Sequence, residues 1–220
     1  MRSFKNDPDV KAKYISRVKA HMAADELIRG TGWDGHRGCA VGCTLDYYDH
    51  SLYPIELDIP EWVAKLEDVI FEGMPDELAM TWPLRFLEAV PVGMTDAQWQ
   101  SVLHRTAARR MTYLVDQLEP EIGDSWGVVE AVRAVLDLHA AESTDTESWS
   151  AASRAASRAA CRAAWSAACS AANSAANSAE WSASLRESGI KDNRAAMEAS
   201  YLRESEWLLS AIAESTQDRT

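Results

Sequence analysis

The sequence predicts an all-α protein: a compact helical N-terminal domain, a long alanine-rich helix and a closing C-terminal helix. Apolar residues recur at spacings of three and four between capping residues, and no stretch alternates apolar and polar residues long enough to predict a strand. Residues 150–184 form an alanine-rich tetrapeptide repeat with no glycine or proline, which strongly favours helix. A chain of 220 residues can also bury a core without disulfide bonds.

The first predicted helix begins at Asp7-Pro8, where a cap precedes a proline that suits the first turn, and ends at Gly30. Residues spaced by four and three form one stripe on it: Tyr14, Val18, His21, Asp25 and Ile28. Two members of this stripe, His21 and Asp25, are polar. We therefore expect them to form a hydrogen-bonded pair on one helix face, which either anchors the glycine-rich loop or faces a ligand.

Further helices are predicted over residues 58–73, 83–93, 95–118 and 124–140. Prolines and acidic residues mark their starts, and glycines or a proline mark several of their ends. Thr95 and Gln98 form a capping box, and Asp124 or Ser125 can cap the last helix. We expect a helical domain at 1–140 with a glycine-rich loop at 30–54, a polar linker at 141–149, and the two C-terminal helices at 150–216.

The alanine repeat predicts self-association. Four residues advance about 400° around a helix, so the Ala-Ala stripe turns by about 40° per repeat. A helix of this kind lacks one fixed apolar face and requires neighbours on several sides, which the N-terminal helices, the last helix or a second subunit can supply. We therefore expect a homo-oligomer, with Gly189 ending the repeat before the final helix.

Charge and hydropathy exclude two classes of partner. The 34 acidic residues outnumber the 22 basic ones and give a net charge of -12, which disfavours direct nucleic-acid binding. No apolar run approaches the roughly 18 residues that a membrane-spanning helix needs. The N-terminal residues lack the apolar segment of a signal peptide, so we expect a cytoplasmic protein with reduced cysteines.

A glycine-rich loop is the first candidate binding site. Five of the ten glycines lie between Gly30 and Gly42, including a G-x-G-x-x-G segment. This segment follows a predicted helix rather than a strand, so it is not a dinucleotide-binding fingerprint. The loop either has only a conformational role or offers backbone amides to a small anionic ligand.

Arginines in the alanine repeat form a second candidate site. Arg154 and Arg158 lie one helical turn apart, with Arg162 a turn further on. We expect them either to pair with acidic side chains or to hold phosphate groups. The predicted ligand-binding set combines both regions: His21, Asp25, Arg29, Gly35, His36, Arg37, Gly38, Arg154, Arg158 and Arg162.

The cysteines near the loop suggest three interpretations. Cys39 and Cys43, flanked by His36 and His50, supply the ligand types of a zinc site, although the spacing fits a zinc knuckle poorly. Alternatively, both are small buried side chains at the start of a short helix, in which case no cofactor is expected. In a third interpretation Cys39 is a reactive thiol at a helix N-terminus, with His21 or His36 as base and Asp25 orienting it.

An acidic segment gives a further alternative. Residues 46–77 contain ten acidic side chains and one lysine. Such a segment is either a solvated face or a surface that docks on a basic protein and mimics nucleic acid. Charge reversal around Glu67, Asp68 and Glu72 would test the docking interpretation.

Several motifs together resemble a family of uncharacterised proteins from bacteria and their phages. They are His21-Met-Ala-Ala-Asp25, Gly38-Cys-Ala-Val-Gly-Cys-Thr44, His50, Tyr53 and Ile70-Phe-Glu-Gly73. The resemblance covers about the first 95 residues and implies a phage or mobile-element accessory protein, including a host-defence antagonist. It implies no catalytic role. The sequence thus favours a non-catalytic protein that sequesters an anionic, nucleotide-like ligand, followed by an acidic inhibitor and then a zinc- or Cys/His-dependent enzyme.

Overall fold

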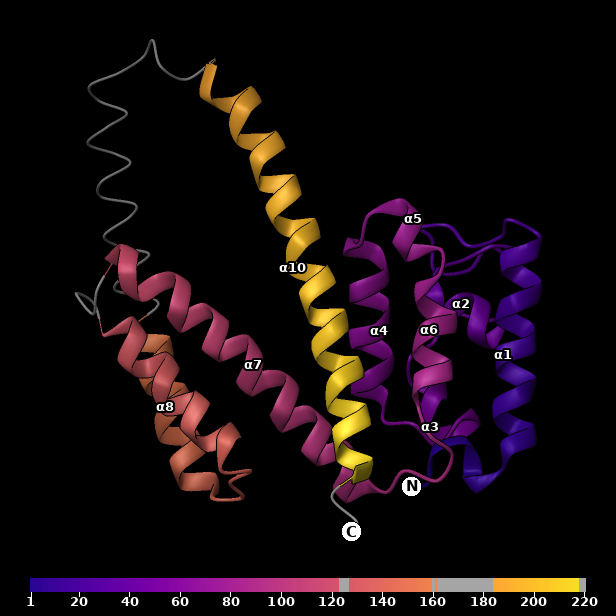
Figure 1. The fold of residues 1–220 in the computed structure, drawn as a ribbon, viewed down its shortest axis with the longest axis horizontal. Coiled ribbons are helices and arrows are strands. Elements are labelled where there is room, and N and C mark those ends of the chain that lie inside the picture. Colours follow the sequence, from indigo (N-terminus) through magenta and orange to yellow (C-terminus); the bar gives the residue numbers. More distant parts are fainter. Residues whose placement is uncertain (123–126, 160, 162–183, 218–220) are drawn as a thin grey trace. The chain divides into compact units, whose positions relative to one another are not determined.

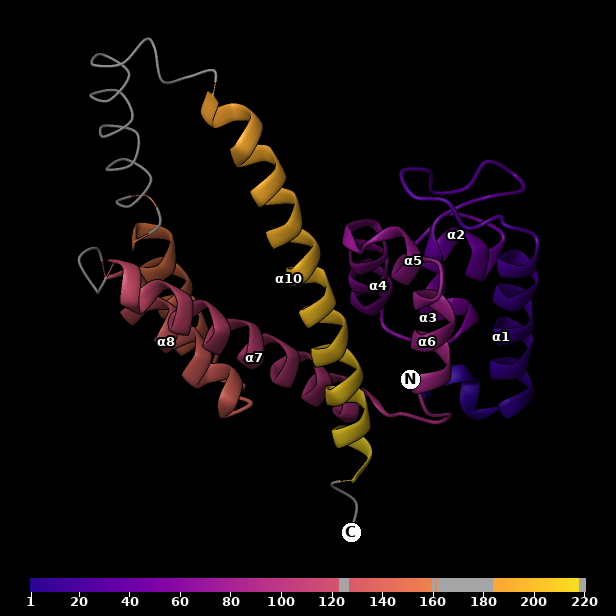
Figure 2. The same ribbon diagram turned by 45° about the horizontal axis from the view of Figure 1, so that its top comes forward.

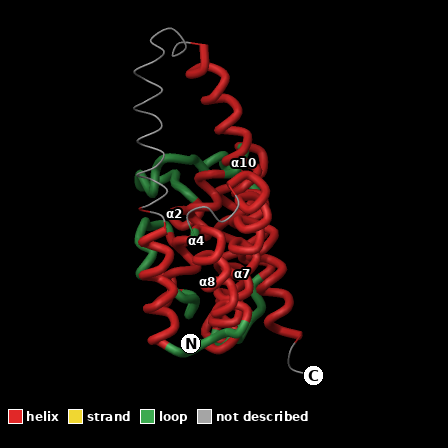
Figure 3. Tube along the Cα trace, turned by 90° about the vertical axis from the view of Figure 1, so that its left-hand side faces the viewer, coloured by secondary structure: helices red, strands yellow, loops and turns green. Residues whose placement is uncertain are grey.

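The protein is all-α, as the sequence predicts. The computed structural model describes residues 1–122, 127–159, 161 and 184–217, and within these ranges it contains helices and loops but no strand (Figures 1 and 3). Contacts divide the chain into unit 1, Met1–Val102 with Ala195–Thr220, and unit 2, Leu103–Arg194. No described helix is long and apolar enough to cross a membrane.

Unit 1 is a cluster of mostly short helices, and α6 lies between α1 and α4 (Figures 1 and 2). Its elements in chain order are η1 (Ser3–Asn6), α1 (Pro8–Ala23), α2 (Ala40–Leu45), α3 (Leu52–Glu56), α4 (Glu61–Gly73), α5 (Asp76–Ala79), α6 (Trp82–Ala89), the start of α7 (Asp96–Ile122) and the end of α10 (Ser184–Gln217).

The apolar faces of these helices form one buried core. Ile70 and Phe71 of α4 are fully buried, as are Trp82 and Phe86 of α6. From the far end of the chain, α10 adds three buried residues to the same core: Leu208, Ala211 and Ile212. Removal of this apolar surface from water is the main driving force that assembles unit 1.

The first helix is shorter than the sequence predicts. It begins at Pro8, where the Asp7 side chain accepts a hydrogen bond from the Asp9 amide, but it ends at Ala23 rather than Gly30. Asp25 follows with φ of 58°, a left-handed conformation that ends the helix and that a short polar side chain tolerates. The glycine-rich loop therefore begins at residue 24 and leads into α2.

The last helix is longer than the sequence predicts. Gly189 does not interrupt it, because α10 runs from Ser184 to Gln217. One glycine costs about 1 kcal/mol in a helix interior, which a helix of this length can absorb. Likewise α7 continues past Pro120 to Ile122, while its predicted capping box is confirmed: Thr95 and Gln98 each accept a hydrogen bond from the other's backbone amide.

Unit 2 contains the rest of α7, α8 (Val128–Ala140) and a helix over residues 146–159. Asp145 precedes that helix and accepts a 3.0 Å hydrogen bond from the Glu147 amide. His104 and His139 face each other with their Nδ1 atoms 3.1 Å apart, beside the Trp149 ring. The expected caps Asp124 and Ser125, and most of the predicted repeat helix including Arg162, lie outside the described residues.

Leu208→Ala should destabilise unit 1 by about 2–5 kcal/mol, because it removes a fully buried side chain from the core. The exposed Ser210→Ala, two residues further along α10, should change the free energy of unfolding by less than about 0.5 kcal/mol. Urea unfolding measures both values. Equal stability of Leu208→Ala and the wild type would show that the end of α10 does not pack on the other helices of unit 1.

Candidate functional site

Histidines and carboxylates hold the glycine-rich loop against α1. The Nδ1 atom of His21 lies 2.6 Å from Glu26 Oε2, and its Nε2 atom lies 2.8 Å from Asp46 Oδ1. The second Glu26 oxygen lies 2.9 Å from Nε2 of His36. The expected pair of His21 with Asp25 is therefore absent, because α1 ends before Asp25, and His21 instead joins the two ends of the segment that contains the loop.

The two arginines predicted to bind an anion in unit 1 contact acceptors of the chain itself. Arg29 donates to the backbone carbonyls of Glu72 and Met74 at the end of α4, and it forms an ion pair with Asp76. Arg37 pairs with Asp34 at 3.3 Å. Arg29 thus satisfies carbonyl groups at the C-terminus of α4, where cations are favoured.

Backbone amides of the loop also have carboxylate partners. Asp34 Oδ1 accepts hydrogen bonds from the amides of His36, at 3.0 Å, and Arg37, at 2.7 Å. Glu72 Oε2 accepts a 2.8 Å bond from the Gly30 amide. The loop amides named here therefore bind carboxylates of the protein itself, and binding of an external anion by the loop stays a prediction.

Two loop glycines have clear conformational roles. Gly35 has φ of 99°, which allows the turn at the exposed tip of the loop. Gly38 is buried, and a Cβ atom at this position would overlap the Gly32 carbonyl oxygen. These features support the conformational interpretation of the loop.

Cys39 and Cys43 are buried at the start of the short helix α2, as one of the three interpretations holds. Cys39 is the N-cap, and its Sγ accepts a 3.5 Å hydrogen bond from the Gly42 amide. Burial raises the pKa of the Cys39 thiol well above its usual value, and the nearby Asp68 carboxylate raises it further. Burial also raises the pKa of Cys43 to about 12. This burial argues against the interpretation of Cys39 as an activated thiolate, because it opposes the effect of the helix N-terminus.

The acidic segment is not wholly a surface, because α4 buries two of its carboxyl groups. Glu67 is fully buried, and Tyr53 donates a 2.6 Å hydrogen bond to its Oε2 atom. Asp68 is 7% exposed and its Oδ2 atom contacts the Tyr48 hydroxyl at 3.0 Å and His50 Nε2 at 3.1 Å. Neither acid can meet a protein partner across a solvated face.

The sequence contains a signal for this burial that a count of charges does not show. Glu67 stands four residues from Val63 and from Phe71, so it belongs to the apolar stripe of α4. Burial raises the pKa of Glu67 to about 8, while the Tyr53 hydrogen bond opposes that rise.

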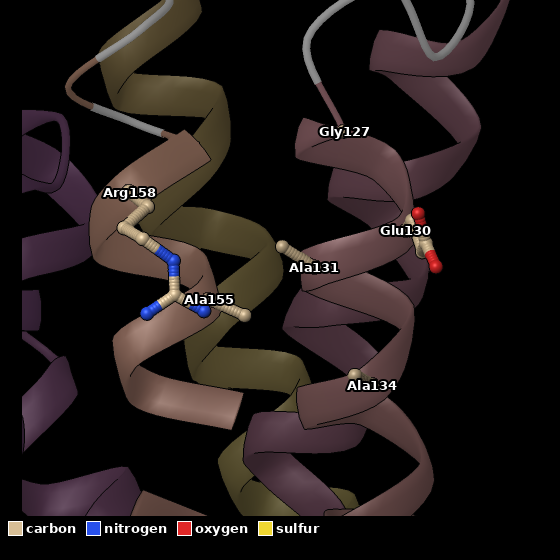
Figure 4. Close-up of a pocket in the computed structure, with 6 residues that line it drawn as sticks. All are labelled: Gly127, Glu130, Ala131, Ala134, Ala155 and Arg158. Carbon is tan, nitrogen blue, oxygen red and sulfur yellow. The ribbon is translucent and has the colours of Figure 1, made fainter. Parts of the chain in front are cut away.

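A cavity of about 290 Å³ in unit 2 contains one of the predicted arginines (Figure 4). Its lining residues are Gly127, Glu130, Ala131, Ala134, Ala155 and Arg158. The Arg158 side chain lies beside Ala155, whereas Glu130 points away from it on the far side of α8 (Figure 4). Of the other predicted arginines, Arg154 is exposed and bonded to the Ser150 hydroxyl.

Asp25 lines a second, smaller cavity, which lies in unit 1. Its volume is about 100 Å³, and it is lined by Met22, Asp25, Leu27, Met80 and Thr81. This volume lies well below the roughly 300–1,000 Å³ of small-molecule pockets and is too little for a nucleotide.

Comparisons with known proteins add no evidence on function, so the function is argued from the residues of this chain. The chain matches no protein-family model, no curated protein and no solved structure. The resemblance of its N-terminal motifs to the bacterial and phage family therefore stays a prediction.

Glu67→Gln should remove a pH dependence of stability. Because folding raises the pKa of this carboxyl from 4.5 to about 8, the folded state holds a proton that the unfolded chain releases. The free energy of unfolding should therefore fall as pH rises from about 4.5 to 8, with a slope of up to about 1.4 kcal/mol per pH unit. Urea unfolding in the presence of a chelator measures this slope in both proteins.

The exposed Glu77→Gln is the matched control, and it should keep the slope of the wild type. An unchanged slope in Glu67→Gln would show that the Glu67 carboxyl does not carry the proton.

Proposed function

We propose that the protein binds a small anionic, nucleotide-like ligand without catalysing its conversion, and that Arg158 of unit 2 contacts the anionic group. The observation that carries this proposal is the cavity of about 290 Å³ that Arg158 lines. Within the described part of the chain, no ion pair or hydrogen bond engages its guanidinium group.

The chemistry of the cavity suits a phosphate-bearing molecule. A guanidinium group offers two parallel N–H donors that match phosphate oxygens. Gly127, the N-cap residue of α8, lines the same cavity, and the amides of a helix N-terminus favour negative charge. The volume lies near the lower end of small-molecule pockets, and the alanine side chains leave space for an apolar or planar part of the ligand.

The other two functions that the sequence suggests have less support. A surface that docks on a basic protein would lack Glu67 and Asp68, which are buried, although the exposed acids of the segment remain available to a basic partner. An enzyme with Cys39 as nucleophile has less support, because within the described residues no hydrogen bond joins the Cys39 sulfur to His21 or His36.

We also propose that the protein forms a homo-oligomer and acts as a phage or mobile-element accessory protein. Ala152 and Ala159 are buried within the chain itself, so one side of the repeat helix is already covered. A second copy of the chain would cover another side, which supports a homo-oligomer. The resemblance of the N-terminal motifs supports a cytoplasmic phage or mobile-element accessory protein that antagonises a host defence.

Arg158→Gln should weaken ligand binding at least tenfold, about 1.4 kcal/mol, because it removes a charged donor from the cavity. Isothermal titration calorimetry with inorganic phosphate and with ATP as probes measures the dissociation constants. Arg158→Lys should bind with intermediate affinity, since it keeps the charge but loses the paired donors.

Arg133→Gln is the matched control, because Arg133 is an exposed arginine of the same unit that pairs with Glu119. It should bind like the wild type. The proposal fails if neither probe binds to the wild type, or if Arg133→Gln weakens binding as much as Arg158→Gln does.

The homo-oligomer is tested separately. Light scattering of the purified protein should give a molar mass of at least two chains. A single-chain mass across the accessible concentration range would contradict the predicted self-association.

A further inference from the structure

We propose that unit 1 holds a divalent transition-metal ion, Zn²⁺ foremost, at Cys39, Asp68 and Glu72. The Cys39 sulfur and one carboxylate oxygen from each acid all lie within 4.8 Å of one another. This site is separate from the anion cavity of unit 2 and does not depend on the proposed ligand-binding function.

Two helices bring the three donors together. Asp68 and Glu72 lie one turn apart on α4, so their side chains share one helix face. Cys39 caps α2, which packs against α4. Because each donor belongs to a helix or its cap, the cluster is held by the packing of unit 1 and not by a free loop.

An unsatisfied oxygen is the independent observation that indicates a ligand. Asp68 is 7% exposed, and both of its side-chain hydrogen bonds, from Tyr48 and with His50, involve Oδ2. Its Oδ1 atom is buried and receives no N–H or O–H hydrogen bond from the described residues, and the Cys39 thiol, itself a member of the cluster, is the nearby donor to this carboxylate. A buried acceptor without a partner costs free energy, and an ion bound at this position would remove the cost.

The hydrogen bonds around the cluster orient the carboxylates for metal binding. Tyr48 and His50 fix Asp68 through Oδ2, and the Gly30 amide fixes Glu72 through Oε2. Within the described chain, the second oxygen of each carboxylate has no such bond. Outer hydrogen bonds of this kind commonly hold metal-binding side chains in position.

The donor types identify the class of ion. A cysteine sulfur favours zinc and related transition metals, whereas Mg²⁺ and Ca²⁺ bind through oxygen. Tetrahedral zinc bonds of about 2.3 Å to sulfur and 2.1 Å to oxygen place these donors about 3.6 Å apart. Small side-chain rotations bring donors within 4.8 Å to that distance. On binding, the Cys39 thiol releases its proton to solvent and the sulfur coordinates as a thiolate.

This site differs from the zinc site that the cysteine and histidine spacing suggested. Cys43 stands outside the cluster, and its thiol donates to the backbone carbonyls of Gly38, at 3.4 Å, and Glu26, at 3.7 Å. His36 is 75% exposed and pairs with Glu26. Of the suggested zinc ligands, Cys39 belongs to the cluster, and His50 orients Asp68 through its Oδ2 atom.

The structure supplies a matched pair of cysteine variants for the test. Co²⁺ is titrated into the chelator-treated, full-length protein, and the thiolate-to-cobalt charge-transfer band is followed in the near-ultraviolet region. The wild type should develop the band at one ion per chain, and added Zn²⁺ should abolish it. Cys39→Ser should lose the band, whereas Cys43→Ser should keep it.

Two isosteric variants keep the test decisive if Cys39→Ser does not fold. Asp68→Asn and Glu72→Gln should each weaken Co²⁺ binding at least tenfold, with circular dichroism confirming that they remain helical.

The proposal is overturned if the wild type gives no band, as expected if water fills the site. It is also overturned if the band survives in Cys39→Ser, since another thiol such as the exposed Cys161 would then supply the sulfur. Unchanged affinity in both carboxyl variants would overturn it as well.

Discussion

Inside the core of unit 1, the Tyr53 hydroxyl donates a 2.6 Å hydrogen bond to the carboxyl group of Glu67. A buried carboxyl group is costly unless polar partners surround it, so the elements around α4 must supply them. Tyr53 does so from α3, and Tyr48 and His50 contact the neighbouring Asp68 from the segment between α2 and α3. The two buried carboxyl groups of α4 thus help to position α3 and the segment between α2 and α3.

The same rule explains why the glycine-rich loop has little capacity left for an external ligand. Its amides bind Asp34 and Glu72, and Arg29 satisfies carbonyl groups at the end of α4. Glu72 also belongs to the proposed metal cluster, so the loop and the metal site share one side chain. The anion-binding function is accordingly proposed for unit 2, where Arg158 lines a cavity. Within the described chain, its guanidinium group forms no hydrogen bond or ion pair with another residue.

Local signals predicted much of the fold, and long-range contacts account for the rest. The capping box of Thr95 and Gln98 and the end of α4 at Gly73 follow from neighbouring residues. The end of α1 does not, because Asp25 adopts a left-handed conformation that the helical spacing of its neighbours conceals. The cluster of Cys39 with Asp68 and Glu72 joins residues about thirty positions apart, and only the packing of α2 on α4 brings them together.

We propose that this protein carries ligands at two independent sites, an anion in unit 2 and a metal ion in unit 1. Native mass spectrometry of the protein purified from cells measures both ligands at once, with Arg158→Gln and Asp68→Asn beside the wild type. The wild-type chain should carry two mass increments, of which Arg158→Gln loses only the anionic ligand and Asp68→Asn only the metal ion. A wild-type chain with no bound mass would refute the proposal, and so would the loss of both increments in either variant.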